Sequence, residues 1–378
     1  MFKTTFRNLG SHRVRFLLTC VAIVLGVGLL TGTHVLTDTV RATFDDLFEE
    51  VSGGVDLTVR AQTAFENNAY GSDRELVDAS IVDAIRSVPT VEVAEGSVEG
   101  YAEMIGEDGI AIQPPGAPTL GWSWSDVPEF NAFRIRDGRP PRDSGEVVVD
   151  AGTADSHDLA VGDTVDILLT GSKRSFEIVG VARFGEADNL AGATVTLFDP
   201  ATAVDILTAG AGFTSIEVIG TDGTELAELQ EDVVAILPDG FETVTAAQLA
   251  EETTSAVTDG FGIFETGLLV FAGVSLFVAG FIIFNTFSIV VAQRAREIGM
   301  LRAIGAGRRQ IMVSVIVEAV VMAVLGAGLG VLFGLAVAHG LLAVFDLMGI
   351  SLPSTDLRLE PGTVWAGFGL AVLVTVLA

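Results

Sequence analysis

The sequence predicts a membrane α-helical bundle of four spans, with a large α+β extracytoplasmic domain between spans 1 and 2. Three observations lead to this prediction. Hydrophobic residues make up 49% of the 378 residues, and they gather in four long apolar runs. The whole formal net charge of -28 lies in residues 52–260, which hold 38 acidic and 10 basic residues. A region this acidic is disfavoured in lipid and repels nucleic acid, so we expect it to fold in water.

The four apolar runs are interpreted as membrane spans, each of which needs about 20 apolar residues. The first run is just long enough, and the second and third are longer than one span requires. The fourth has 15 residues and reaches the last residue without a polar or basic flank. We interpret it as a truncated span, so the natural chain is expected to continue. The runs are residues 16–36, 261–292, 311–345 and 364–378.

Basic residues near the spans predict the orientation, because they favour the cytoplasmic side. Residues 1–15 form a basic amphipathic segment without acids, and residues 293–310 carry five arginines against Glu297 alone. Both segments are expected in the cytoplasm, whereas the acidic residues 37–260 and the loop 346–363 are expected outside. Arginine outnumbers lysine 19 to 2, which fits a prokaryote. The sequence thus predicts a multi-pass plasma-membrane protein with a cytoplasmic N-terminus, whose first span is an anchor rather than a cleaved signal peptide.

Glycines at four-residue spacing predict a contact between membrane helices, within or between subunits, because small residues let helix backbones approach closely in lipid. They lie in the first and third spans, at Gly28, Gly32, Gly326, Gly330 and Gly334.

Glu318 is an acid about eight residues into the third span, where an ionisable group is costly. Three roles stay open for it: pairing with an arginine at the interface, gating, and proton or ion transport.

The outer region alternates strand and helix patterns, which predicts an α+β domain. A helix is expected over 74–88, turns at Gly96 and at 108–109, and a loop over 113–130 that holds Trp122 and Trp124. Those two tryptophans either contact a partner or lipid, or one packs and one stays on the surface. The closely spaced strands between 146 and 199 predict a small barrel or curled sheet. The final segment 246–265 has no helix breaker before Gly260 and is expected to run as a stalk helix toward the second span.

Signatures of catalysis and of metal binding are absent from the sequence. The chain has no phosphate-binding G-x-x-x-x-G-K-[ST] motif, no G-x-S-x-G and no H-E-x-x-H. It has one cysteine, and its four histidines follow no ligand spacing. We therefore expect no catalytic residues, no metal and no cofactor bound by this chain itself.

The basic segment between the second and third spans has more structure than a topological signal requires. In "QRAREIGMLRAIGAGRRQI" (293–311), Ile298, Leu301 and Gly305 fall on one face of a helix. Gly305-Ala306-Gly307 would end that helix. Positive charge alone would suit a loop that only fixes topology. The ordered helix and its apolar face favour docking to a partner.

This segment resembles the cytoplasmic loop of the FtsX/MacB/LolC-type ABC transporter permeases, which runs R-x-x-E-I-G-x-L-R-A-x-G-A. The opening "FRNLGSHRVRFLLTCVAIVLGVGLL" and the stretch "IVEAVVMAVLGAGLGVLFG", which includes Glu318, are similar to the first and third spans of that family. The order of one span, a large outer domain and three further spans is also the same. The outer domain matches only in its α+β layout.

The resemblance implies that the segment is a coupling helix, residues 293–310, docking on a separate cytoplasmic ATPase dimer that binds ATP and Mg. The implied docking residues are Arg296, Glu297, Ile298, Gly299, Leu301, Arg302, Gly305 and Ala306. A second permease unit is also implied, as a homodimer or as the other half of a longer chain.

The function that follows from the resemblance is mechanotransmission, in which ATP hydrolysis in the partner moves the outer domain. It would serve export or extraction of a lipid, lipoprotein, peptide or drug. The alternative is a non-transporting regulator that activates an extracellular cell-wall hydrolase. A membrane sensor without an ATPase would leave the coupling segment unexplained.

Overall fold

The computed structural model describes residues 13–52, 54–63, 74–106, 108–113, 117–190, 192–293, 299–300, 303, 307–347 and 357–377. The chain divides into two compact units. The first comprises Met1–Ala42, Val257–Val344 and Thr355–Ala378, and the second comprises Thr43–Ala256 and Phe345–Ser354.

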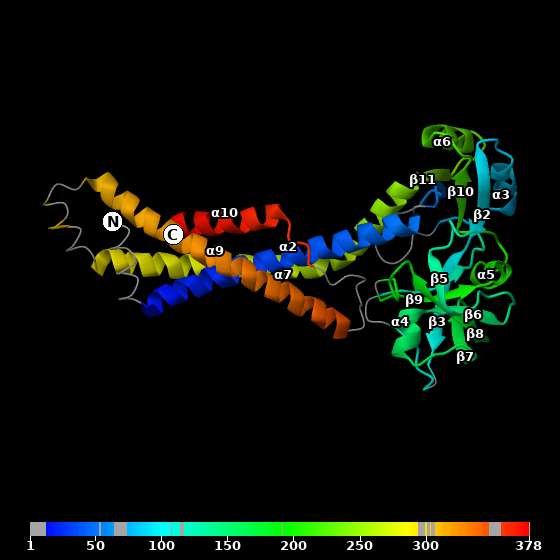
Figure 1. The fold of residues 1–378 in the computed structure, drawn as a ribbon, viewed down its shortest axis with the longest axis horizontal. Helices are drawn as coiled ribbons and strands as arrows, with labels where there is room; N and C mark the ends of the chain where they lie inside the picture. Colours follow the sequence, from blue (N-terminus) through cyan, green and yellow to red (C-terminus); the bar gives the residue numbers. More distant parts are fainter. Residues whose placement is uncertain are drawn as a thin grey trace. The chain divides into compact units, whose positions relative to one another are not determined.

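The first unit is a bundle of helices, drawn in Figure 1. They are α2 (Arg13–Ser52), α7 (Ala246–Gln293), α9 (Arg308–Leu347) and α10 (Pro361–Leu377). Among the described residues, three stretches are long and apolar enough to cross a membrane, namely Cys20–Thr43, Glu265–Thr286 and Ala319–Phe345. Helix α10 is apolar but shorter than these. Helix α2 continues beyond the predicted end of its span at residue 36, because its sequence has no glycine or proline between Gly32 and Ser52.

The predicted glycine positions lie where α2 and α9 touch. A Cβ added to Gly334 would lie 2.8 Å from the carbonyl oxygen of Gly28 and 2.9 Å from the backbone nitrogen of Gly32. A Cβ on Gly330 would lie 2.8 Å from Cβ of Val27, and one on Gly326 would meet Ile23 at the same distance. The absence of side chains on these glycines therefore allows the two helix backbones to approach each other.

Helices α7 and α10 pack on the same two helices. A Cβ on Gly26 of α2 would lie 3.0 Å from Leu276 of α7, and one on Gly367 of α10 would lie 3.3 Å from Val27. One buried cluster draws residues from all four helices: Ile23, Val27, Ile283, Ala327, Val331 and Ala371. The start of α10 is also tied to α2, because the Thr363 hydroxyl donates to Asp38 at 3.1 Å.

The second unit contains two lobes, and the smaller one is an antiparallel four-stranded sheet in the order β11-β1-β10-β2. Helices α3 and α6 cover one face of it, and their apolar side chains share a core with the inward residues of β1 and β10. The elements are β1 (Leu57–Ala61), α3 (Ala79–Arg86), β2 (Val91–Ser97), β10 (Ser215–Gly220), α6 (Leu226–Val234) and β11 (Phe241–Thr245).

The larger lobe is the small barrel that the closely spaced strands predicted. Its strands follow the order β5-β8-β6-β9-β4-β3-β7, and β7 also pairs with the long strand β8, which closes the sheet. Its core holds large side chains such as Phe176, Phe198 and Met104. The elements are β3 (Glu99–Ile105), β4 (Thr119–Ser123), β5 (Phe133–Gly138), β6 (Glu146–Asp150), α4 (Ala151–Ser156), β7 (Thr164–Leu169), β8 (Ser172–Phe184), β9 (Thr194–Phe198) and α5 (Pro200–Leu207).

Two local predictions for the outer domain were wrong. The helix expected over 74–88 begins only at Ala79, because the Asp78 side chain accepts the N–H of Ser80 and caps it there. Gly96 is not a turn but lies inside β2, where the ring of Phe213 would come within 2.4 Å of an added Cβ. The turn expected at 108–109 is present, with Gly109 at a positive φ.

The tryptophan segment also differs from the expected loop. Residues 119–123 form strand β4, which pairs in parallel with β9. Trp122 packs edge-on against Phe133 and Phe184, and Trp124 is buried. Both tryptophans are therefore packed, and the prediction that one of them stays on the surface was wrong.

Several contacts join the two lobes. Phe213 packs against the cores of both lobes. The Ser125 hydroxyl, after β4, donates to Glu95 of β2 at 2.8 Å. Gly54, which precedes β1, lies so close to Glu129 that an added Cβ would be 2.6 Å from its carbonyl oxygen.

The glycine contact between α2 and α9 predicts opposite effects for two Gly→Ala substitutions in α9. Gly334→Ala would push a methyl group against the backbone of α2, and we expect a loss of about 1–3 kcal/mol of stability. Gly340→Ala meets nothing within 4 Å, so its better helix propensity is expected to add about 0.5–1 kcal/mol. Denaturation of the two variants in detergent would measure the difference. Equal stabilities would contradict the close contact.

Candidate functional site

The segment predicted to dock a partner joins α7 to α9. In the middle of this segment, Gly299, Met300 and Ala303 are described, and all three are helical and exposed. Among the described residues, no atom lies within 4 Å of a Cβ added to Gly299. Seven of the predicted docking residues lie outside the described residues: Arg296, Glu297, Ile298, Leu301, Arg302, Gly305 and Ala306.

The segment ends at a cap that starts α9. The side-chain oxygen of Gln310 accepts the N–H of Gly307 at 3.1 Å, and the N–H of Gln310 donates to the Gly307 carbonyl at 3.0 Å. These reciprocal bonds satisfy groups that a helix N-terminus leaves unpaired. Gly307 therefore belongs to the start of α9, whereas the sequence predicted it in the terminator of the preceding helix.

Glu318 lies in α9, one residue before the candidate span Ala319–Phe345. Its side chain is outside the described part of the structure, so none of the three roles predicted for it is distinguished.

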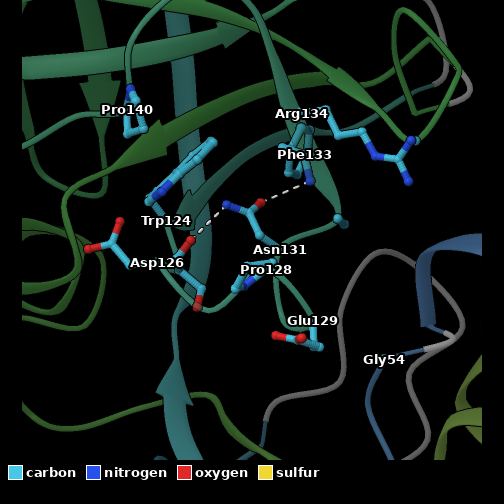
Figure 2. Close-up of a pocket in the computed structure, with 12 residues that line it drawn as sticks. Gly54, Trp124, Asp126, Pro128, Glu129, Asn131, Phe133, Arg134 and Pro140 are labelled. Carbon is cyan, nitrogen blue, oxygen red and sulfur yellow. Dashed lines mark hydrogen bonds between the residues drawn. The ribbon is translucent and has the colours of Figure 1, made fainter.

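The outer domain contains a pocket of about 490 Å³ beside the loop between β4 and β5 (Figure 2). Its floor includes the buried Trp124 and Phe133, whereas Asp126, Glu129 and Arg134 are exposed. The lining residues are Gly54, Trp124, Ser125, Asp126, Pro128, Glu129, Asn131, Ala132, Phe133, Arg134, Pro140 and Gly185.

Asn131 holds the loop at this pocket in shape. Its side-chain amide donates to the Ser125 carbonyl at 2.8 Å and accepts the N–H of Phe133 at 2.9 Å, as Figure 2 shows. Its hydrogen-bonding groups are thus already used within the loop. The pocket has the size of a small-molecule site, but the polar group at its centre serves the loop rather than a ligand.

Three carboxyls in the outer domain have raised pKa values, and for Glu99 the cause is burial, which outweighs a hydrogen bond from Trp122. Burial raises the pKa of Asp150 to about 6, although the N–H groups of Val195 and Thr153 both donate to it at 2.8 Å. Burial and the neighbouring Glu95 raise the pKa of Glu217 to about 8. Glu217 lies directly opposite Glu95 on the paired strands β10 and β2. Asp150 caps α4 and so has a structural position, whereas Glu217 and Glu95 lie on the sheet face toward the β4–β5 loop.

No group of three or more His, Cys, Asp or Glu side chains that could hold a metal ion occurs among the residues that the structure describes.

Two protein families match the chain in adjacent stretches. The MacB-like periplasmic core domain matches residues 16–236, and the FtsX-like permease C-terminal domain matches residues 269–378. The second match includes the basic segment between α7 and α9.

Individual relatives agree with these matches. The chain is 39% identical over 80 residues to the macrolide export ATP-binding/permease protein MacB of Rhodopseudomonas palustris strain BisB18, which covers 21% of this chain and 11% of that protein. It is 25% identical over 349 residues to an uncharacterized ABC transporter permease protein of Mycobacterium tuberculosis, covering 91% of this chain and 38% of that protein. The chain thus spans only a minor part of each relative.

Among solved structures, the chain is similar to the periplasmic region of MacB from Actinobacillus actinomycetemcomitans. The TM-score is 0.42 at 13% identity, and the match covers 53% of this chain and 94% of that one.

The raised pKa of Glu217 predicts a stability that depends on pH. A folded-state pKa above the usual 4.5 means that the folded protein binds this proton more tightly than the unfolded chain. Its contribution is therefore complete at low pH and is lost as the pH rises toward 8. Because the effect of Asp150 ends near pH 6, the interval from pH 6 to 8 separates Glu217 from Asp150, and the Glu217→Gln variant separates it from Glu99. Glu217→Gln should stabilise the domain at pH 8 by on the order of 2 kcal/mol.

Thermal unfolding followed by tryptophan fluorescence would measure this effect, since two of the three tryptophans lie in the outer domain. The control is Glu92→Gln, an exposed position on β2, which should leave the pH dependence unchanged. The idea fails if Glu217→Gln keeps the pH dependence of the wild type.

Proposed function

Because the chain belongs to the family of FtsX- and MacB-like ABC transporter permeases, we propose that it couples ATP hydrolysis in a separate cytoplasmic ATPase to movement of its outer domain. The match to the MacB-like core domain over residues 16–236 carries the family assignment. Three candidate spans make it a multi-pass membrane protein. The coupling mechanism, the ATPase partner and the cargo are what we propose.

The single observation that carries the proposal is the continuity of α7. This helix runs without interruption from Ala246 to Gln293, so it joins strand β11 of the outer domain to the first residue of the predicted coupling segment. Each backbone N–H inside a helix bonds to the carbonyl four residues earlier, which resists bending. A displacement of the coupling segment would therefore be passed along α7 to the sheet.

The coupling segment would dock on the ATPase through the side chains implied by the family motif. Glu297 and Leu301 are four residues apart and so share one face of a helix. The chain has no phosphate-binding loop, so ATP and Mg would be bound by the ATPase dimer. The C-terminal end of the segment is joined directly to α9, which begins after Gly307.

Helix α10 would be the fourth span. Its contacts favour this, because Ala371 lies in the cluster shared by all four helices and Gly367 packs against α2. The arginines of the coupling segment would place that segment and the N-terminus in the cytoplasm. The acidic domain would then lie outside. A second permease unit would complete the complex.

Cargo would be handled at the outer domain rather than in a central channel. The proposed cargo classes are lipids, lipoproteins, peptides and drugs, and the related MacB protein is a macrolide exporter by name. The same movement could instead activate an extracellular cell-wall hydrolase without moving any cargo.

Docking predicts that two substitutions in the coupling segment release the ATPase. Glu297→Lys reverses a charge in the interface, and Leu301→Asp buries a charge there. We expect each substitution to lower the affinity for the ATPase at least tenfold, which is about 1.4 kcal/mol. Copurification of the ATPase encoded beside this chain would measure it.

The matched control for the docking experiment is Met300→Asp, an exposed neighbour outside the predicted docking set. It should retain the ATPase, and all variants should insert into the membrane normally. Normal copurification of the ATPase with Leu301→Asp would rule out docking through this segment. The permease alone, tested in parallel, should not hydrolyse ATP.

Transport predicts ATP-dependent release of bound material. The complex in proteoliposomes should release copurifying lipid or peptide when ATP is added, and Leu301→Asp should abolish that release. If no cargo moves while a secreted hydrolase binds the outer domain and becomes active on ATP addition, the regulatory function replaces transport.

A further inference from the structure

The chain enters and leaves the outer domain at one end of the four-stranded sheet. Strand β1 follows α2, and strand β11 leads directly into α7 (Figure 1). The two strands are antiparallel neighbours, with Leu57 opposite Thr245. The sheet residues nearest to α7 therefore belong to β1 and β11, and any side-chain link between them and α7 acts at the base of that helix.

The start of α7 is capped by a local device. The Thr245 hydroxyl accepts the N–H of Gln248 at 3.2 Å, and the Gln248 side chain accepts the N–H of Thr245 at 3.0 Å. This is a reciprocal capping box. It fixes where the helix begins, but it joins only residues three apart in the chain, so it leaves the direction of α7 relative to the sheet to other contacts.

Arg60 of β1 makes such a longer-range contact. Its Nε donates to Oε1 of Glu242 on β11 at 2.9 Å, and its Nη2 donates to Oε2 of Glu252 on α7 at 2.6 Å. The Arg60 side chain is only 12% exposed. The planar guanidinium holds its N–H donors in fixed directions, so it fixes the positions of both carboxylates relative to each other. One side chain thus joins two strands to the second turn of the helix.

Arg74 strengthens the same group of charges. Its Nη1 donates to Glu242 at 2.9 Å and to the Ala61 carbonyl at 2.5 Å. Burial alone would raise the pKa of Glu242, but hydrogen bonds from Arg74 and Arg60 outweigh it and hold that pKa below its usual value. Glu242 therefore stays ionised and keeps Arg60 in place.

From this arrangement we propose that Arg60 is a positioning residue that fixes the base of α7 to the sheet through Glu252. Resting on the proposed function, this ion pair delivers the movement of α7 to the four-stranded lobe. The capping box sets the first residue of the helix, and Arg60 sets its angle. Without the Arg60–Glu252 pair, the base of α7 would be held by the capping box and by the burial of Thr254, and part of a displacement at the coupling segment would be lost as a change in the angle of α7.

Glu252 gives the sharper test, because its side chain is 53% exposed. Glu252→Gln removes the negative charge and leaves at most a weaker neutral hydrogen bond to α7, while the pairing of Arg60 with Glu242 inside the sheet remains. Arg60→Gln removes both links and serves as the second variant. The matched control is Glu251→Gln, the exposed neighbour on the same turn of α7.

The experiment follows the angle of α7 through a distance measured in the 378-residue chain, without ATPase or nucleotide. Cys20, the one cysteine of the sequence, is replaced by serine. Nitroxide labels are attached at Thr266→Cys on α7 and Glu92→Cys on β2, both exposed positions. Pulsed electron–electron double resonance, with the protein in nanodiscs, then gives the distribution of distances between the labels.

We expect a narrow distribution in the wild type and in Glu251→Gln, and one at least twice as wide in Glu252→Gln and Arg60→Gln. Arg60→Lys, which keeps the charge but loses the fork, should lie between them. Equal widths in all variants would overturn the proposal. Because no ATPase is present, a failure of docking at the coupling segment would not affect this result.

A second measurement separates positioning from general stability. With the ATPase bound, ATP should change the label distance in the wild type, and Glu252→Gln should reduce that change at least twofold. The amount of copurified ATPase and its hydrolysis rate should stay unchanged, since the coupling segment is intact. A full-size distance change in Glu252→Gln would show that the ion pair does not transmit movement.

Discussion

The membrane bundle depends on the close approach of α2 and α9. Gly334 lies against the backbone of α2 at Gly28 and Gly32, with no room for a methyl group on either side. Between helices in lipid there is no hydrophobic driving force, so close van der Waals contact has to supply the attraction. Once α2 and α9 are joined, α7 and α10 can pack along the same helices through Gly26 and Gly367. Helix α2 thus contacts each of the other three helices of the bundle.

Two of the chain connections between the outer domain and this bundle are helices. Helix α7 leads from β11 without a break, and α2 ends shortly before β1. Both helices therefore join the same small sheet, at adjacent strands. The barrel lobe is attached to that sheet through Phe213 and through the hydrogen bond from Ser125 to Glu95. In the proposed function the small sheet receives the movement first, and the barrel follows it.

Much of this organisation could be predicted from the sequence. Apolar length indicates the three candidate spans, and glycine spacing indicates the face where α2 and α9 meet. The lack of a breaker between residues 246 and 259 indicates that stalk and span form one helix. The errors were local. Strand β4 looked like a loop because its residues 119–123 contain a glycine and lie between prolines, and pairing with β3 on one side and β9 on the other makes them a strand. Gly96 looked like a turn, whereas the ring of Phe213 occupies the space that a side chain at this position would need.

Arg60 marks the limit of prediction from sequence. In "LTVRA" it is a polar residue at an alternate position of a strand, which indicates only that it faces away from the core. Its partners Glu242 and Glu252 lie about 180 and 190 residues further along the chain, and pairing over that distance follows from strand order. The sequence alone determined three candidate spans, the charge of the outer domain, the glycine stripes and the family motif, because these depend on local composition and spacing. Only the tertiary structure decided which charges meet at the base of α7 and that the glycines of α9 pack against those of α2, because those contacts require the fold to bring distant segments together.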